Sequence, residues 1–170
     1  MSKAFTRESD DAPEIPVRPR RTSALPPGTR NYLTAGGAQR LRDELNNLLN
    51  TERPALAAIT NDEAAKSRLV AVDDRVDQIQ ETLRSATVVD APPAPHDEAR
   101  FGATVTVRNR QGEETHYRIV GMDETDIDRD WISWLSPIAK ALLNARVGQK
   151  VGIKLPAGDD ELVIIAIRHE

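Results

Sequence analysis

The chain has 170 residues, enough for one domain or two small ones, and its formal net charge is −4. Only 4% of the residues are aromatic, so any core is aliphatic, and the acidic balance argues against broad nucleic-acid binding, which requires a basic face. The absence of cysteine excludes disulfides, thiol nucleophiles and zinc–thiolate sites, and no apolar run approaches the ~20 residues of a membrane helix. We therefore expect a cytoplasmic monomer with no membrane contact and no direct sequence-specific binding of nucleic acid.

Residues 1–30 are predicted to be a disordered extension. They hold five of the eleven prolines, and their charges change from acidic between Glu8 and Glu14 to basic between Arg18 and Arg21. Such a composition cannot bury enough apolar surface to offset chain entropy. The arginines could contact RNA or an acidic protein face, and a solvated tail is the simpler interpretation.

Residues 31–90 are predicted to form an antiparallel coiled-coil arm of two α-helices. Apolar residues recur at alternating steps of three and four, the heptad pattern of packed helices. They are Leu69, Val72, Val76, Ile79, Leu83 and Ala86 in the second half, and Ala38, Leu41, Leu45, Leu48, Ala55 and Ile59 in the first, where Glu52 is the one charged interruption. A helix of about 25 residues is ~37 Å long, so the arm should project from a small domain.

Local signals mark the ends of these helices and one irregularity. Thr34 is a good N-cap, with Leu33 ahead of it as a hydrophobic staple. Pro54 should kink the first helix, and residues 52–60 beyond the kink are expected to be less firmly packed. The segment 60–63 has turn and N-cap chemistry between the two helices.

A Pro-rich linker is predicted at residues 91–99, followed at residues 100–170 by a small antiparallel β-sheet domain with one short helix. Alternating segments predict strands at 104–108, 115–120, 131–134, 150–155 and 162–167, with a turn at 110–112 and an acidic loop at 123–130. Ser136 is an N-cap, followed by Pro137 at the first position of a short helix that continues over 138–143. The predicted fold class is therefore α+β.

Several short sequence motifs follow one another along this chain. They are Tyr32-Leu33-Thr34, Leu41-Arg42-Asp43-Glu44-Leu45, Glu52-Arg53-Pro54, Lys66-Ser67-Arg68-Leu69, Val72-Asp73-Asp74-Arg75-Val76, Phe101-Gly102-Ala103, Tyr117-Arg118-Ile119-Val120-Gly121, Ser136-Pro137-Ile138-Ala139-Lys140-Ala141-Leu142-Leu143 and Val147-Gly148. The ordered set resembles the GreA/GreB family of bacterial transcript-cleavage factors, and the GreB branch more than GreA. The resemblance covers nearly the whole chain from Asn31 onward.

The resemblance implies RNA polymerase as the partner. Family members bind it with an FKBP-like C-terminal domain and insert the coiled-coil arm into the secondary channel. An acidic pair at the arm tip helps hold a catalytic Mg²⁺ with which the polymerase cleaves its own backtracked RNA, and carboxylate oxygens suit that ion. This chain is expected to carry no cofactor or metal of its own, with the polymerase's Mg²⁺ relevant only if the tip is active.

At the arm tip the sequence departs from the family pattern. The family's acidic motif at the tip is missing, and roughly a dozen residues are absent between Pro54 and Lys66. If the loss is split between two helices, the arm is ~9 Å shorter. Asp62 and Glu63 form an acidic pair at the new tip and are the only candidates for a catalytic role. As helix-start residues they complement the helix dipole and need no other explanation.

The predicted polymerase-binding residues are Trp134, Leu135, Ser136 and Pro137. The family usually has an acidic residue directly before Ser-Pro, where this chain has Leu135. An exposed Trp134 or Leu135 would be an apolar anchor on a partner. Alternatively one of them faces the core, because strand alternation sends the two side chains to opposite faces.

These observations predict a regulator, not an enzyme, that docks at the secondary channel of RNA polymerase without stimulating transcript cleavage. One alternative is a working cleavage factor in which Asp62 and Glu63 replace the missing tip acids. Another is an Rnk-like polymerase-binding regulator, which resembles the same fold with a short arm. Prolyl isomerase activity is disfavoured, because it needs an aromatic-lined pocket and fold analogy alone does not carry function.

Overall fold

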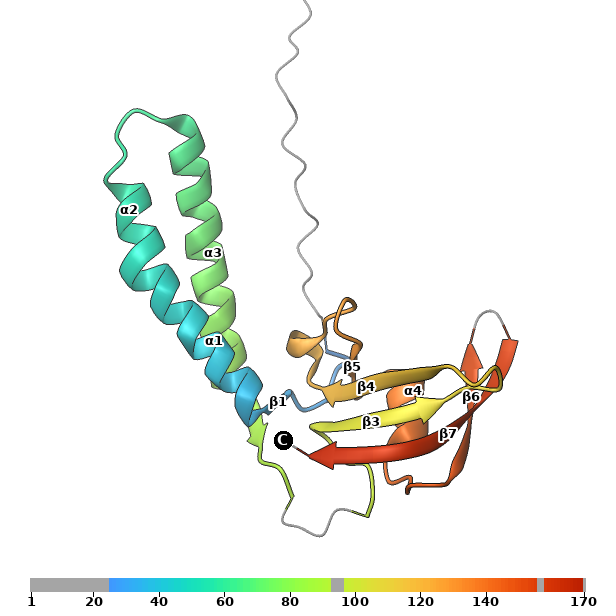
Figure 1. Ribbon diagram of the computed structural model, residues 1–170. Helices are drawn as coiled ribbons and strands as arrows, with labels where there is room; N and C mark the ends of the chain where they lie inside the picture. The colour runs from blue at the N-terminus through green and yellow to red at the C-terminus, as the bar shows by residue number, and fades with distance from the viewer. Residues whose placement is uncertain (1–24, 93–96, 156–157, 170) are drawn as a thin grey trace, which may run out of the picture.

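The computed structural model describes residues 25–92, 97–155 and 158–169, and it has the predicted α+β composition. A helical hairpin projects from one side of a curled five-stranded sheet (Figure 1). Residues 1–24 of the predicted disordered extension lie outside the described residues, as do residues 93–96 of the predicted linker. Residues 25–30 include a turn in which the Thr29 N–H donates to the Pro26 carbonyl at 3.0 Å. Within the described ranges, no helix is long and apolar enough to cross a membrane.

The hairpin consists of two limbs that run in opposite directions side by side (Figure 1). The first limb contains α1 (Ala35–Asn47), the π-helical stretch η1 (Leu48–Glu52) and α2 (Arg53–Ala57), and the second limb is α3 (Glu63–Ser85). The apolar seam lies between the limbs as the periodicity predicts. Its buried residues are Leu33, Ala38, Leu41, Leu48, Val72, Val76 and Ile79.

Pro54 explains the π-helical stretch in the first limb. Proline has no backbone N–H, so the regular ladder of hydrogen bonds is interrupted at this point. The Arg53 N–H reaches back five residues to the Leu48 carbonyl, which widens the helix locally. Beyond this point Ala55 is exposed and Ile59 is 48% exposed, so the outer part of the first limb is loosely covered, as predicted.

The base of the hairpin is closed by a pair of strands that the sequence did not predict. Strand β1 (Tyr32–Thr34) enters α1, and β2 (Thr87–Val89) leaves α3; the two are paired in parallel. Ala86 ends α3 with extended backbone, which lets the chain turn and run beside β1. The prediction that residues 31–90 form an arm of α-helices alone therefore missed this pair of strands.

The C-terminal sheet has the strand order β5-β4-β3-β7-β6. Its strands are β3 (Ala103–Arg108), β4 (Glu114–Val120), β5 (Trp131–Ser133), β6 (Lys150–Leu155) and β7 (Gly158–His169). Strands β3, β4, β6 and β7 pair antiparallel, whereas β5 pairs with β4 in parallel. The expectation of a purely antiparallel sheet was wrong, because the segment 121–130 carries the chain back along β4 before β5 begins.

The sheet domain has its own hydrophobic core, separate from the hairpin seam. Helix α4 (Pro137–Leu142) buries Ala139 and Leu142 against the inward-facing residues of the strands. The strand residues of this core are Ala103, Val105, Val107, Ile119, Val151, Ile153, Leu162 and Ile164. Their alternation along β3 is the period of two that predicted the strands.

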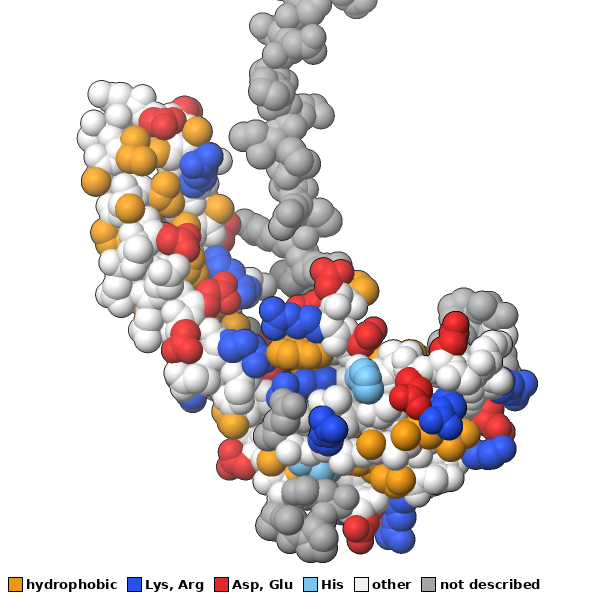
Figure 2. Space-filling view, viewed as in Figure 1, with side chains coloured by type: hydrophobic (Ala, Val, Ile, Leu, Met, Phe, Trp, Pro, Cys, Tyr) orange, Lys and Arg blue, Asp and Glu red, His pale blue; other side chains and the backbone are white. Residues whose placement is uncertain are grey.

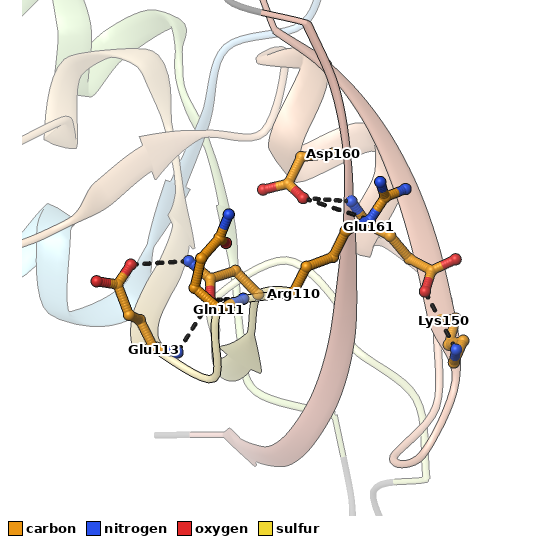
Figure 3. A network of polar contacts seen from close by, with 7 residues as sticks. Arg110, Gln111, Glu113, Lys150, Asp160 and Glu161 are labelled. Carbon is orange, nitrogen blue, oxygen red and sulfur yellow. Dashed lines mark hydrogen bonds and ion pairs between the residues drawn. The ribbon is translucent and has the colours of Figure 1, made fainter.

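The end of the sheet farthest from the hairpin is held by polar contacts (Figure 3). In the β3–β4 turn, the Asn109 side chain accepts the backbone N–H groups of Gln111 and Glu113 at 3.0 and 2.9 Å. Arg110 approaches Asp160 of β7 at 3.9 Å. The predicted turn at 110–112 is confirmed, and Gly112 adopts φ 87°, where a residue without Cβ is favoured.

Candidate functional site

The arm tip places the two candidate acidic residues next to each other, each with a structural partner. Asp62 is the N-cap of α3, as predicted, and its carboxylate accepts the Ala64 N–H at 2.8 Å. Glu63 pairs with Lys66 at 3.1 Å. Both side chains are exposed, and no group of three or more metal-binding side chains exists in the described part of the chain. The arrangement at the tip is that of a capped helix start.

The turn between β5 and α4 gathers the four predicted docking residues. Ser136 Oγ accepts the Ala139 N–H at 3.1 Å, and Pro137 occupies the first turn of α4, so the predicted N-cap is confirmed. Leu135 is half-buried and its N–H donates to Ser133 Oγ at 3.2 Å. Pro137 is exposed, whereas the three residues before it are half-buried.

Of the two orientations considered for Trp134, the structure shows the inward one. The indole is half-buried against the sheet core, and its ring lies 5.2 Å from the Tyr32 ring in an edge-to-face arrangement. Tyr32 also lies 6.0 Å from the Phe101 ring. Trp134 therefore joins the hairpin base to the sheet domain, and its contact with a polymerase stays a prediction.

Glu124 is a buried carboxylate at the hairpin–sheet junction that sequence reasoning missed. It lies in the short 3₁₀ turn η2 (Met122–Glu124), inside the segment predicted only as an acidic loop, and is 7% exposed. Its Oε2 accepts the Thr34 N–H at 2.8 Å, and its Oε1 accepts the Thr34 hydroxyl at 2.5 Å. Arg40 of α1 donates to the same carboxylate at 3.2 Å. One side chain of the sheet domain thus binds the first turn of the hairpin.

The cap of α1 is completed by this carboxylate from outside the helix. Thr34 Oγ1 accepts the Gly37 N–H at 2.9 Å, the usual N-cap bond. In a capping box, a glutamate three residues after the N-cap would bond the N-cap N–H. Here that position is Gly37, where a Cβ would lie only 1.9 Å from Glu124 Oε1. A threonine N-cap with glycine at the box position is the one sequence signal that could have suggested an external carboxylate.

Close backbone approach and aromatic stacking complete the junction. A Cβ on Gly121 would lie 2.0 Å from the Tyr32 carbonyl oxygen, so the two segments touch through their backbones. On the outer side, the Trp131 ring is surrounded by the guanidinium groups of Arg40, Arg118 and Arg129, at 4.6, 4.9 and 5.4 Å. Figure 2 shows basic side chains on both sides of a hydrophobic one where the hairpin meets the sheet. These contacts fix the orientation of the hairpin relative to the sheet.

Two ion pairs set the limbs of the hairpin against each other. Arg75 donates to both oxygens of Glu44, at 2.6 and 2.9 Å, and Arg53 donates to Asp73 at 2.6 Å. The hydrogen bond that Arg75 donates to Glu44 raises the pKa of Arg75 above its ordinary value, and the hydrogen bond that Arg53 donates to Asp73 does the same for the pKa of Arg53. In these pairs Arg75 lies level with Glu44 and Arg53 lies level with Asp73 across the hairpin.

Comparison with known proteins shows a consistent similarity to transcription elongation factors. Residues 94–169 match the family described as "Transcription elongation factor, GreA/GreB, C-term". "Transcription elongation factor GreB" of Neisseria meningitidis serogroup A is 36% identical over 155 aligned positions, covering 83% of this chain and 95% of that protein. The protein of the same name from Pseudomonas aeruginosa is 33% identical, covering 89% and 95%. "Transcription elongation factor GreA" of Trichlorobacter lovleyi is 36% identical, covering 81% and 96%.

Proposed function

The chain belongs to the GreA/GreB family of transcription elongation factors, and from this premise we propose that it binds bacterial RNA polymerase in the cytoplasm. The sheet domain provides most of the binding to the polymerase, and its turn Trp134–Pro137 contacts that partner. Its resemblance to the family implies that this domain is FKBP-like. The hairpin acts as a coiled-coil arm that enters the secondary channel. The protein works as a monomer and has no cofactor of its own.

We further propose that this factor does not stimulate transcript cleavage. The observation that carries this proposal is the tip geometry: α2 ends at Ala57, α3 begins at Glu63, and Asp62 caps α3. A carboxylate must lie about 2.0–2.6 Å from an ion to ligate it. If roughly a dozen residues are missing, the tip falls ~9 Å short of the position reached by a full-length arm.

The alignments support a shortened chain. The comparison with the Neisseria meningitidis relative has 155 positions, whereas 83% of 170 residues is about 141. About 14 aligned positions therefore face no residue of this chain. That difference agrees with the number of residues that the tip lacks relative to the family pattern.

A cleavage assay with backtracked polymerase complexes tests the proposal. We expect no RNA shortening with the wild type, and we expect excess protein to inhibit the cleavage that a full-length Gre factor stimulates, through competition for the same dock. The double variant D62A/E63A should compete as well as the wild type, as should the control D77A/E81A on the exposed side of α3. RNA shortening that the wild type supports and D62A/E63A loses would establish the cleavage-factor alternative, and a lack of competition would contradict the polymerase dock.

A further inference from the structure

The five-stranded sheet has two edges, and they differ in how they are closed. Strand β5 at one edge has only three residues, and on its side away from β4 the Trp131 N–H donates to the Asp126 carbonyl at 2.8 Å. Strand β6 at the other edge has six residues and pairs with β7. On its other side, no strand or bridge of the described residues pairs with it. An edge with a free row of backbone N–H and C=O groups is a template for a further strand.

The hydrogen-bond pattern shows which groups of β6 face the free side. The Ile164 N–H of β7 donates to the Gln149 carbonyl at 2.9 Å, so Gln149 is in a position bonded to β7. Bonded and non-bonded positions alternate along an antiparallel pair of strands. Lys150, Gly152 and Lys154 therefore occupy non-bonded positions, and their backbone N–H and C=O groups point away from β7.

The exposed face of β6 carries two cations with open space between them. Lys150 and Lys154 are exposed, whereas Val151 and Ile153 are buried in the core of the sheet domain. A Cβ placed on Gly152 would meet no atom within 4 Å. A residue that stands opposite Gly152 in an added strand therefore has room for a large side chain, with a lysine two positions away on either side.

The charges at this edge favour an acidic strand and disfavour a second copy of β6. Lys150 pairs with Glu161 of β7 at 3.1 Å (Figure 3). A strand added beyond β6 meets the lysines first, because β7 lies one strand spacing, about 4.8 Å, farther away. An antiparallel pair of two β6 strands centred on Gly152 would set Lys150 of each copy opposite Lys154 of the other, and like charges placed directly opposite each other are destabilising.

We infer that the free edge of β6 binds an extended acidic segment of another protein, which joins the sheet as a sixth, antiparallel strand. Backbone hydrogen bonds to Lys150, Gly152 and Lys154 hold the segment, and its side chains give the specificity. Two acidic residues four positions apart stand opposite the lysines, and a large side chain midway between them covers Gly152. This inference does not depend on the proposed binding of RNA polymerase.

Titration of the full-length protein with the fluorescently labelled peptide Thr-Glu-Val-Trp-Val-Glu-Thr tests this inference. We expect saturable binding, measured by fluorescence anisotropy, and at least ~10-fold weaker binding when lysines replace the two glutamates. Methyl groups on the backbone nitrogens of the glutamates should abolish binding, because these N–H groups face β6, whereas methyl groups on the valine nitrogens should leave the affinity unchanged. No binding at about 1 mM peptide, or binding that ignores the position of the methyl groups, would overturn the inference.

Hydrogen exchange then locates the bound peptide on the protein. In the free protein the N–H groups of Lys150, Gly152 and Lys154 should exchange fast, and saturating peptide should slow their exchange at least ~10-fold. Exchange rates that the peptide leaves unchanged would overturn the assignment to this edge. Dimers that protect the same three groups without peptide would assign the edge to a second copy and overturn the inference as well.

Variants of β6 separate the backbone from the charge. Gly152→Pro removes one outward N–H and leaves the bonds between β6 and β7 in place, so it should weaken peptide binding at least ~10-fold. Lys154→Glu, which keeps every backbone bond, should weaken binding to a similar extent. Lys66→Glu, at an exposed lysine of the arm, is the matched control and should leave the affinity unchanged. Equal affinities for Lys154→Glu and Lys66→Glu would contradict the acidic nature of the partner.

Discussion

The Glu124 carboxylate accepts the backbone N–H of Thr34 at 2.8 Å, although the two residues are 90 positions apart in the chain. This bond places a sheet-domain side chain in the cap of the first arm helix. A helix cap normally fixes where a helix begins. Here it also fixes the direction in which the arm leaves the sheet domain, because the partner of the cap belongs to another part of the fold.

Glu124→Ala should destabilise the protein by about 1–3 kcal/mol, because it leaves buried donors at Thr34 without a partner. Chemical denaturation followed by circular dichroism measures the change. Glu81→Ala is the matched control, since it removes only an exposed i,i+3 pair with Arg84 and should cost about 0.5 kcal/mol or less. Equal effects of the two substitutions would show that the junction bond contributes nothing.

Gly37→Ala and Gly36→Ala should have opposite effects on stability, although the residues are neighbours. A Cβ at Gly37 would meet Glu124 Oε1 at 1.9 Å, whereas a Cβ at Gly36 meets only the flexible end of Arg40 at 3.5 Å. We expect a loss of about 1–3 kcal/mol for the first and a gain of up to about 1 kcal/mol for the second. Thermal unfolding checks both, and a neutral Gly37→Ala would disprove the close approach.

Val76→Asp should cost several kcal/mol and reduce the helical signal, because it places an unpaired charge in the buried seam of the hairpin. Val70 lies on the same helix and is 62% exposed, so Val70→Asp should change the stability and the helical signal little. The comparison is made by far-ultraviolet circular dichroism and denaturant titration. A helical signal that survives Val76→Asp undiminished would contradict the packing of the two limbs.

The ion pair between Glu98 and Arg146, at 2.7 Å, should make the sheet domain sensitive to acid. The hydrogen bond from Arg146 is the main cause that lowers the pKa of Glu98 below its ordinary value of 4.5. A lowered pKa means that the pair stabilises the fold above pH 4.5 and that this contribution is lost as the pH falls below it. The stability difference between wild type and Arg146→Gln should therefore persist at neutral pH and shrink in acid; a difference independent of pH would refute the pairing.

Ser136→Asp should weaken polymerase binding by more than about tenfold, or ~1.4 kcal/mol, if the β5–α4 turn is the dock. Aspartate is as good an N-cap as serine, so α4 should keep its cap while the turn gains a charge. Gln111→Asp, in the exposed turn at the far end of the sheet, is the control. Affinity is measured by titration against core polymerase, and equal affinities for the two variants would remove the turn from the interface.

Elements defined by local chemistry were predictable from the sequence. The alternation along β3, the Ser136–Pro137 helix start and the Asp62 cap depend on residues within a few positions of one another, and all three are confirmed. The parallel pair of β1 and β2 and the burial of Glu124 depend on contacts more than 50 positions apart. The two strands have only three residues each, and Glu124 is one of several acidic residues in its segment. Neither stretch shows a hydrophobic periodicity that would distinguish it from a loop.

Because the base of the hairpin is closed, the length of the arm can change without altering its attachment to the sheet domain. The Thr87 N–H donates to the Asn31 carbonyl at 2.8 Å, so the two points where the chain enters and leaves the arm are one hydrogen bond apart. Equal lengthening or shortening of both limbs leaves this attachment unchanged. Arm length can therefore diverge between relatives while the sheet domain stays constant, and a longer tip grafted between Ala57 and Glu63 would leave the sheet domain along the same axis as the present one.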